Sequence, residues 1–334
     1  MNIFAITLLK WFREHGRDLP WRQTRDPYAI WLSEVILQQT QVKQGWDYWL
    51  RFMRRWPTVA DLAAATEDEV LRQWQGLGYY SRARNLHAAA RQIIAAGGFP
   101  TTIEGLRALK GVGDYTAAAI GSIAFDLPAA VVDGNVYRVL ARHYGIATPI
   151  NTTEGKHEFA ALAQSLLPEA EASAYNQAIM DFGATQCTPQ SPDCDTCPLQ
   201  ETCAAFREGR IGELPVKRRT LKVKERHLIY VYVRCNGYTA IHRRPAGDIW
   251  QGLYEPLCVE DSNLSPLFSL LSPLKKNVKH VLTHRIIYAD FYLLEADERP
   301  ALPVGYFWIP EAALGDYAVP RLIEILLEEL RGGR

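Results

Sequence analysis

The apolar residues of this chain change their spacing near residue 207, and this change restricts the possible folds more than any other feature. Up to about residue 206 they recur every three or four positions between glycine-rich stops, which is typical of short helices. After residue 226 the apolar runs are β-branched and aromatic, as in Leu228-Ile-Tyr-Val-Tyr-Val, and favour strands. Because single cores stop growing near about 250–300 residues, the 334 residues and their two patterns predict two domains.

We expect an all-α domain over residues 1–206, a basic linker over 207–226 that acts as a solvated tether or touches phosphates in passing, and an α+β domain over 227–334. The helices expected in the first domain lie near residues 2–15, 28–39, 41–55, 58–65, 67–75, 79–96, 102–109, 114–125, 133–144, 154–166 and 171–184. The strands expected in the last domain lie near 228–234, 238–242, 253–259, 285–294 and 306–309, with helices near 264–271 and 320–331.

Composition and charge exclude some classes of protein. The chain is 48% hydrophobic and 22% charged, which is globular rather than disordered. The net charge is zero, but residues 151–206 carry one basic and eight acidic side chains, whereas 207–226 carry eight and three. No apolar run approaches the roughly 20 residues of a membrane helix, and the N-terminus lacks a basic signal-peptide region. We therefore expect a cytoplasmic protein whose local charge patches decide its partners.

Four of the six cysteines form a tight group with the spacing Cys187-x6-Cys194-x2-Cys197-x5-Cys203. In a cytosolic chain such a group argues against disulfides and for a metal. Structural zinc sites usually draw on two close pairs of ligands, whereas this loop has one close pair and two single cysteines. Four thiolates on one short loop suit a [4Fe–4S] cluster, with zinc as the alternative. Cys235 and Cys258 lie in apolar surroundings and are expected to be ordinary core thiols.

A glycine hairpin precedes an isolated acidic residue. In Leu109-Lys-Gly111-Val-Gly113-Asp-Tyr115-Thr-Ala the two glycines permit a tight turn that presents backbone N–H groups at the start of a helix, which suits an anion. Twenty residues after Gly113, Asp133 opens another helix in Val-Val-Asp133-Gly-Asn135-Val-Tyr-Arg. Taken separately, the first segment could be a plain helix–helix turn and the second an N-cap aspartate.

The hairpin, the aspartate helix and the cysteine spacing together resemble the endonuclease III superfamily of helix–hairpin–helix DNA glycosylases. The stretches WLSEVILQQTQV (31–42) and GLGYYSRAR (76–84) are similar to those of the MutY-type adenine DNA glycosylases, and the C-terminal extension resembles a Nudix-like domain. The resemblance implies a helix–hairpin–helix module near 22–130, a helical module of residues 1–21 and 131–206 that bears a [4Fe–4S] cluster, and a C-terminal mismatch-recognition domain.

Hydrolysis of an N-glycosidic bond builds positive charge on the sugar and negative charge on the leaving base. The resemblance implies that Asp133 stabilises the sugar and assists water, that Glu34 protonates adenine, and that Asn135 and Tyr115 hydrogen-bond around them. Without the resemblance, a solvated helix residue is the favoured interpretation of Glu34. Bifunctional relatives carry a lysine where this chain has Tyr115, and tyrosine cannot form a Schiff base, so we expect little or no strand cleavage.

The resemblance also implies positions that contact DNA. Those around the extruded adenine are Arg17, Trp21, Arg22 and Gln177. Those at the opened duplex and its backbone are Gln39, Thr40, Leu77, Tyr79, Gly111 and Gly113, although Tyr79 could instead pack on a helix surface. Relatives carry Phe-x-His-x-Phe-Ser-His in the last domain. This chain reads Val278-Lys-His280-Val-Leu-Thr283-His284, which keeps both histidines and a hydroxyl but loses the aromatic rings. These three polar residues are expected to contact the oxidised purine, unless the histidines are simply alternate members of a strand.

The sequence therefore predicts a monofunctional adenine DNA glycosylase of base-excision repair that acts on adenine opposite 8-oxoguanine or guanine. The expected partner is double-stranded DNA, and the expected form is a monomer in a bacterial cytoplasm, associated with the nucleoid through DNA. Two alternatives remain: an endonuclease III-like glycosylase and lyase for damaged pyrimidines, and a non-catalytic iron–sulfur DNA sensor. A Glu-rich Nudix metal motif is absent from the sequence, so hydrolysis of nucleoside diphosphates is not expected.

Overall fold

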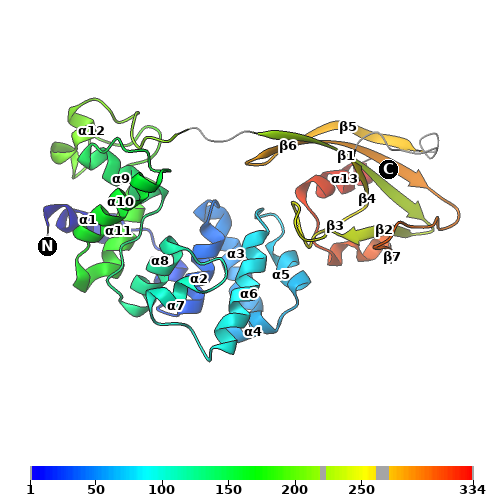
Figure 1. Cartoon of the computed structure of the whole chain (residues 1–334), viewed down its shortest axis with the longest axis horizontal. Coiled ribbons are helices and arrows are strands. Elements are labelled where there is room, and N and C mark those ends of the chain that lie inside the picture. Colours follow the sequence, from blue (N-terminus) through cyan, green and yellow to red (C-terminus); the bar gives the residue numbers. More distant parts are fainter. Residues whose placement is uncertain (1, 219–222, 261–270, 333–334) are drawn as a thin grey trace. The chain divides into compact units, whose positions relative to one another are not determined.

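The computed structural model describes residues 2–218, 223–260 and 271–332, and the chain forms two compact units. The first unit comprises Met1–Ala64 and Ala88–Arg219, and the second comprises Ala65–His87 and Thr220–Arg334. Figure 1 shows that helices make up the first unit and that the C-terminal part contains the sheet. The expected fold class, a helical domain followed by an α+β domain, is confirmed. The domain boundaries expected from the sequence stay a prediction.

The helices agree with the expected ones to within a few residues, apart from short pieces near residues 20, 170, 200 and 205. They are α1 Ile3–His15, η1 Pro20–Arg22, α2 Pro27–Leu37, α3 Val42–Arg55, α4 Val59–Ala64, α5 Glu67–Trp74, α6 Ser81–Ala95, α7 Ile103–Arg107, α8 Asp114–Phe125, α9 Gly134–Tyr144, α10 Thr153–Leu166, η2 Glu169–Glu171, α11 Ala172–Thr185, η3 Gln200–Thr202 and α12 Ala204–Arg207. Within the described ranges, none of the helices combines the length and the apolar character needed to cross a bilayer.

Local signals place the helices that matter for the site. Asp26 caps α2 by accepting from the Tyr28 backbone N–H, and a proline occupies the first turn. Every residue of α2 from Tyr28 to Ile36 is buried, so this helix passes through the interior of its unit. Glu34 lies within that stretch, and the interpretation of Glu34 as a solvated helix residue is therefore wrong.

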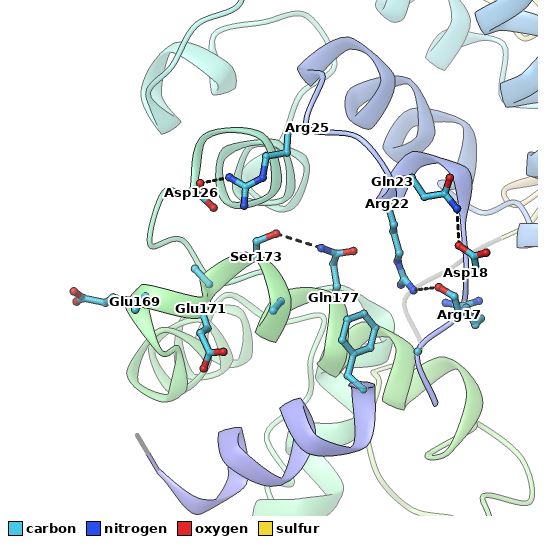
Figure 2. A pocket seen from close by; sticks show the side chains of 15 residues that line it. Arg17, Asp18, Arg22, Gln23, Arg25, Asp126, Glu169, Glu171, Ser173 and Gln177 are labelled. Carbon is cyan, nitrogen blue, oxygen red and sulfur yellow. Dashed lines mark hydrogen bonds and ion pairs between the residues drawn. The ribbon is translucent and has the colours of Figure 1, made fainter. Parts of the chain in front are cut away.

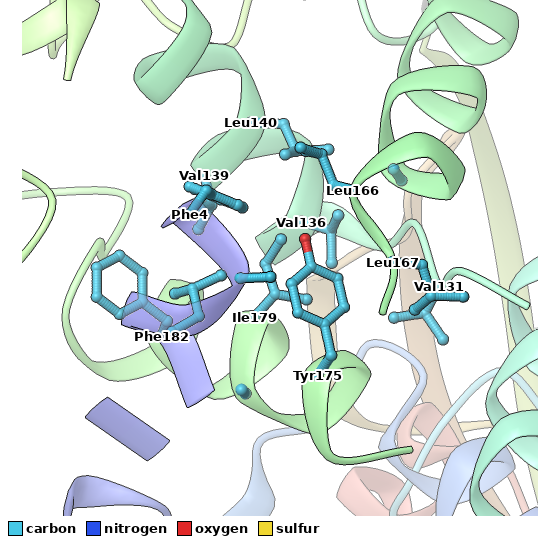
Figure 3. Packing of buried hydrophobic residues seen from close by; sticks show 14 of the residues in the cluster. Phe4, Val131, Val136, Val139, Leu140, Leu166, Leu167, Tyr175, Ile179 and Phe182 are labelled. Atoms are coloured by element: carbon cyan, nitrogen blue, oxygen red, sulfur yellow. The ribbon is translucent and has the colours of Figure 1, made fainter. Parts of the chain in front are cut away.

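One apolar cluster fixes the start of α9. Residues of α1, α9, α10 and α11 interdigitate there, with Val136 and Val139 packed among Ile179 and Phe182 (Figure 3). Such close-packed side chains resist displacement. The next helical turn of α11 has no room for a side chain: a Cβ on Gly183 would lie 2.6 Å from the Asn135 Cβ. The backbone around Asp133 is therefore held by direct helix–helix contact.

The second unit is built on a sheet in which β1 and β6 pair in parallel and the other strand pairs are antiparallel. Within the described residues the strand order is β3-β2-β1-β6-β5, with β4 paired to β1 and β7 to β2. Helix α13 packs against one face through an apolar cluster that includes Leu322, Leu326 and Phe291. The elements are β1 Lys224–Cys235, β2 Tyr238–Arg243, β3 Tyr254–Glu255, β4 Leu257–Glu260, β5 Ser272–Val281, β6 Arg285–Glu295, β7 Tyr306–Pro310, η5 Glu311–Asp316 and α13 Arg321–Gly332.

The second unit contains one strand, β5, that lies outside the strands expected from the sequence. Strand β5 was not predicted, because its sequence SPLKKNVKHV is mostly exposed and lacks an alternating apolar face. The helix expected near 264–271 falls on residues 261–270, outside the described ranges. Cys235 is buried, as expected, and Cys258 packs partly buried against the apolar cluster.

The expected linker is not a solvated tether over its first half. Leu214 is buried, and the Ile150 backbone N–H donates to the Val216 carbonyl at 3.0 Å. The Arg142 guanidinium donates to the Leu214 and Ile211 carbonyls, each at 3.1 Å. The segment up to about residue 216 is therefore packed on the helical unit, and Lys224 already belongs to β1.

We predict that Gly183→Ala destabilises the first unit, because the added Cβ meets the Asn135 side chain and backbone at 2.6–3.1 Å. Overpacking of this kind costs about 1–3 kcal/mol. Thermal unfolding followed by circular dichroism should show a lower melting temperature than the wild type. Gly212→Ala is the matched control, because a Cβ there meets nothing within 4 Å. Equal melting temperatures for both variants would contradict the close packing of α9 on α11.

Candidate active site

Side chains from α2, α8, α9 and α11 line one cavity of about 1050 Å³ in the first unit. Glu34 comes from the buried helix α2, Tyr115 from the first turn of α8, and Asp133 from the N-cap of α9. The structure thus brings together two acids that are separated by 99 positions in the chain. The other predicted residues on the same cavity are Arg17, Trp21, Arg22, Gln39, Thr40, Gly111, Gly113, Asn135 and Gln177.

The environment of Glu34 favours its protonated form. Burial raises the pKa of Glu34 to about 7, the hydrogen bond from Tyr115 opposes this rise, the Asp133 charge adds to it, and the Arg22 charge opposes it. The Tyr115 hydroxyl donates to Glu34 Oε2 at 2.6 Å and lies 3.4 Å from the Met180 sulfur. Burial also raises the pKa of Tyr115 well above its ordinary value, so the phenol stays neutral. Glu34 can therefore hold a proton near neutral pH.

Asp133 lies in a contrasting environment. Its Oδ1 accepts from the Asn135 and Val136 backbone N–H groups at 2.9 and 2.8 Å, and its Oδ2 accepts from Asn135 Nδ2 at 2.8 Å. Burial raises the pKa of Asp133, and these hydrogen bonds together with the Arg138 charge oppose the rise. Burial outweighs these opposing effects, so the pKa of Asp133 lies above its ordinary value. Because Asp133 has three donors to its carboxylate and Glu34 has one, Asp133 is the better placed of the two to carry the charge when the pair holds one proton.

Arg138 and Arg142 were not predicted as site residues. Arg138 Nη2 donates to Asn135 Oδ1 at 2.8 Å, and its Nε donates to the Cys187 carbonyl at 2.7 Å. Arg142 Nη1 donates to the Thr188 carbonyl at 2.7 Å. The two arginines thus connect the helix that carries Asp133 to the cysteine loop. Their helical spacing on α9 is visible in the sequence, but the loop carbonyls that they bind lie 49 and 46 residues away.

Arg17 and Arg22 also line a second, smaller cavity of about 570 Å³, and both cavities share Gln177. Gln177 donates to Ser173 at 3.2 Å, and Arg22 donates to the Arg17 carbonyl at 2.9 Å (Figure 2). Both arginines bind the carboxylate of Asp181, whose side chain is not exposed. Sequence reasoning missed Asp181, because no local motif marks it.

The four clustered cysteines fit a metal cluster. Cys187 follows the end of α11, Cys203 precedes α12, and Arg142 Nη1 lies 3.4 Å from the Cys187 sulfur. Burial raises the pKa of Cys197 to about 11, and the three other sulfurs add to the rise. Thiols that raise one another's pKa become stable thiolates when a cationic cluster neutralises them. A [4Fe–4S] cube takes one thiolate per iron, and the four free cysteines of this loop can supply them.

The remaining predicted contacts lie together in the second unit, on a cavity of about 1090 Å³. Tyr79 is half exposed, its hydroxyl lies 2.6 Å from Thr283 Oγ1, and the Arg82 guanidinium of α6 lies 5.7 Å from the centre of its ring. His280 belongs to β5 and its ring lies 5.8 Å from that of Trp250. His284 lies in the turn before β6, so the two histidines are not alternate members of one strand. Leu77 also lines this cavity.

Comparison with known proteins agrees with this architecture. The model of the HhH-GPD superfamily of base-excision DNA repair proteins matches residues 32–169, and a NUDIX domain model matches residues 229–329. An adenine DNA glycosylase of Buchnera aphidicola subsp. Baizongia pistaciae (strain Bp) is 32% identical over 304 residues, which cover 86% of this chain and 85% of that protein. The chain belongs to the adenine DNA glycosylase family. It lies within the larger superfamily that the helix–hairpin–helix motif indicated.

Two further comparisons show where this family member resembles its relatives. An adenine DNA glycosylase of Rattus norvegicus is 47% identical over 229 residues, covering 64% of this chain but only 44% of the rat protein. The chain thus matches less than half of the length of that relative. A solved structure of a thermostable thymine-DNA glycosylase is 31% identical with a TM-score of 0.57, covering 62% of this chain and 96% of that one. Residues 187–203 match the iron–sulfur binding domain of endonuclease III, which confirms the [4Fe–4S] prediction over zinc.

We predict that the purified protein contains iron and shows a broad visible absorption band, because the four thiolates bind a [4Fe–4S] cluster. Cys197→Ala should lose the band and most of the iron, since it removes one of four ligands. Cys258→Ala is the control, because this thiol lies in the other unit and should leave the spectrum unchanged. Stoichiometric zinc in a colourless wild-type preparation would contradict the cluster.

Proposed function

We propose that this protein is a monofunctional glycosylase that hydrolyses the N-glycosidic bond of adenine in double-stranded DNA. The observation that carries this proposal is the pair of acids on one cavity, where buried Glu34 has one hydrogen-bond donor and Asp133 has three donors that favour its ionised form. Glycoside hydrolysis needs this combination, an acid for the leaving group and a carboxylate for the sugar. The family membership of the chain supports adenine as the leaving base.

The mechanism follows from the positions of the two acids. An adenine nucleotide leaves the base stack and enters the cavity, where Glu34 protonates a ring nitrogen and weakens the bond to the sugar. Asp133 then faces the positive charge that develops on the sugar and activates water. Tyr115 fixes Glu34 by its hydrogen bond and has no amine with which to attack the sugar. The strand therefore stays intact at the abasic site.

The cavity of the second unit supports recognition of the base opposite adenine, which we assign to 8-oxoguanine or guanine. The adjacent hydroxyls of Tyr79 and Thr283 can donate to and accept from a purine edge. The ring of His280 beside Trp250 offers a further polar group on the same cavity. Adenine is a normal base, so its removal has to depend on such a check of the opposite strand.

The same proposal covers partners and location. We assign double-stranded DNA as the partner, gripped by the backbone N–H groups of the hairpin at Gly111 and Gly113 and by Gln39 and Thr40. Lys110 is exposed beside this hairpin and is free to face a phosphate. We also assign to the protein a monomeric form in a bacterial cytoplasm, associated with the nucleoid through DNA.

We predict that the wild type releases adenine from a duplex with adenine opposite 8-oxoguanine, and that the strand breaks only after added alkali. Asp133→Asn and Glu34→Gln should each slow the release by at least about 100-fold, because each removes one of the two catalytic acids. Glu158→Gln is the control, because this exposed side chain of α10 does not line the cavity. Direct nicking of a thymine-glycol duplex would favour the lyase alternative, and binding without product would favour the sensor.

We predict that the rate of adenine release in single turnover falls as pH rises through about 7, since Glu34 must hold its proton to act as an acid. The sign follows from the raised pKa of Glu34: the reactive form is complete at low pH and is lost as pH passes this value. At lower pH the rate should fall again when Asp133 becomes protonated. A rate that does not change between pH 6 and 9 would exclude Glu34 as the proton donor.

We predict that Thr283→Ala weakens the preference for 8-oxoguanine over guanine by about 3- to 10-fold, which corresponds to the loss of one hydrogen bond. Thr283→Ser keeps the hydroxyl beside Tyr79 and should retain the preference. The ratio of single-turnover rates on the two duplexes measures the effect. An unchanged ratio in Thr283→Ala would remove this residue from the recognition site.

A further inference from the structure

Asp181 lies on α11 with its side chain fully enclosed, and five donors surround its carboxylate. Its Oδ2 accepts from the Arg17 backbone N–H at 2.9 Å and from Arg22 Nη1 at 2.7 Å. Its Oδ1 accepts from Arg17 Nε at 2.9 Å, Arg17 Nη2 at 2.5 Å and Arg22 Nη2 at 2.6 Å. Two guanidinium groups are therefore held on one carboxylate with all of its acceptor positions occupied.

The net charge of Arg17, Arg22 and Asp181 follows from the protonation states of their side chains. Arginine stays protonated in proteins. Burial alone would raise the pKa of Asp181, but the hydrogen bonds from Arg22 and Arg17 hold that pKa below its usual value. Arg17, Arg22 and Asp181 together therefore carry one net positive charge. Arg17 and Arg22 present that charge on the cavity that contains Glu34.

Glu34 responds to the charges around it. Tyr115 of α8 donates to it, Asp133 faces it from the N-cap of α9 with Arg138 behind, and Arg22 faces it from η1. Asp133 favours protonation of Glu34, whereas Arg22 favours its ionised form. A buried carboxyl group is sensitive to each charge within a few ångströms, because little water screens it. A second uncompensated cation on this cavity would act in the same direction as Arg22 and favour the ionised form of Glu34 further.

We propose that Asp181 is a positioning residue that fixes Arg17 and Arg22 on the cavity wall and cancels one of their two charges, so that Glu34 keeps its proton at neutral pH. This inference rests on the proposed function of Glu34 as the acid. It assigns to Asp181 an effect on the pH dependence of the reaction, which a residue that only fills space would not have.

The test uses four forms of the full chain, in which the group of Arg17, Arg22 and Asp181 has three different net charges. The single-turnover rate of adenine release is measured between pH 5 and 9 for the wild type, Asp181→Asn, Arg17→Met and the double variant. The net charge is +1 in the wild type, +2 in Asp181→Asn, zero in Arg17→Met and +1 in the double variant. The pH above which the rate falls should move down in Asp181→Asn, up in Arg17→Met, and back toward the wild-type value in the double variant.

A downward move of about one pH unit lowers the rate at pH 8 by about tenfold. Asp181→Glu keeps the charge, so its rate should fall above the same pH as the rate of the wild type, even if its rates are lower at every pH. The visible absorption of the cluster and the melting temperature report whether each variant is folded. If Asp181→Asn does not fold, the upward move in Arg17→Met and its reversal in the double variant still test the charge balance.

A fall at the same pH in all folded variants, with rates reduced equally at every pH, would overturn this inference and leave Asp181 a structural role. The proposed function fails in a different way. The proposed function is overturned if the wild type releases no adenine at any pH. If the rate of the wild type falls near pH 7 and the variants do not move that pH, only the inference about Asp181 is overturned.

Discussion

A carboxyl group removed from water must either keep its proton or be surrounded by hydrogen-bond donors, because an isolated buried charge costs several kcal/mol. The helical unit contains both solutions around one cavity. Glu34 receives one hydrogen bond, and burial favours its protonated form, whereas Asp133 receives three hydrogen bonds that favour its charged form. Asp181 receives five from two arginines. The difference between Glu34 and Asp133 is what turns two similar side chains into an acid and a charge stabiliser.

The rest of the unit holds these groups in place. The N-terminus of α9 carries Asp133 and is pressed against α11 at Gly183, where no side chain fits. Arg138 reaches from Asn135 to the backbone of the cysteine loop, so that the loop braces the same end of the helix. Precise placement matters because charge stabilisation depends on donors and carboxylates that do not have to move during the reaction. The cluster loop thus contributes to the site through the backbone, whatever its redox properties.

The sequence predicts most of the elements and the main site residues, for identifiable reasons. Helix periodicity, caps such as Asp133 and the glycine stops are local signals, so the helix limits agree closely with the structure. Glu34 and Asp133 were predicted from motifs, but neither their shared cavity nor the burial of α2 follows from local pattern. Asp181 and Arg138 act through partners about 45 to 164 positions away, and no local pattern records such pairs. Strand β5 was missed because an exposed edge strand needs no apolar face.

The central claim is that Glu34 and Asp133 act on a single nucleotide that has left the duplex. A crystal structure of Glu34→Gln bound to a duplex with adenine opposite 8-oxoguanine tests it most directly. The account predicts the adenine inside the cavity, with residue 34 facing a ring nitrogen and the Asp133 carboxylate facing C1′ of its sugar. A specific complex with the adenine still stacked in the duplex, or bound away from these two residues, would contradict it.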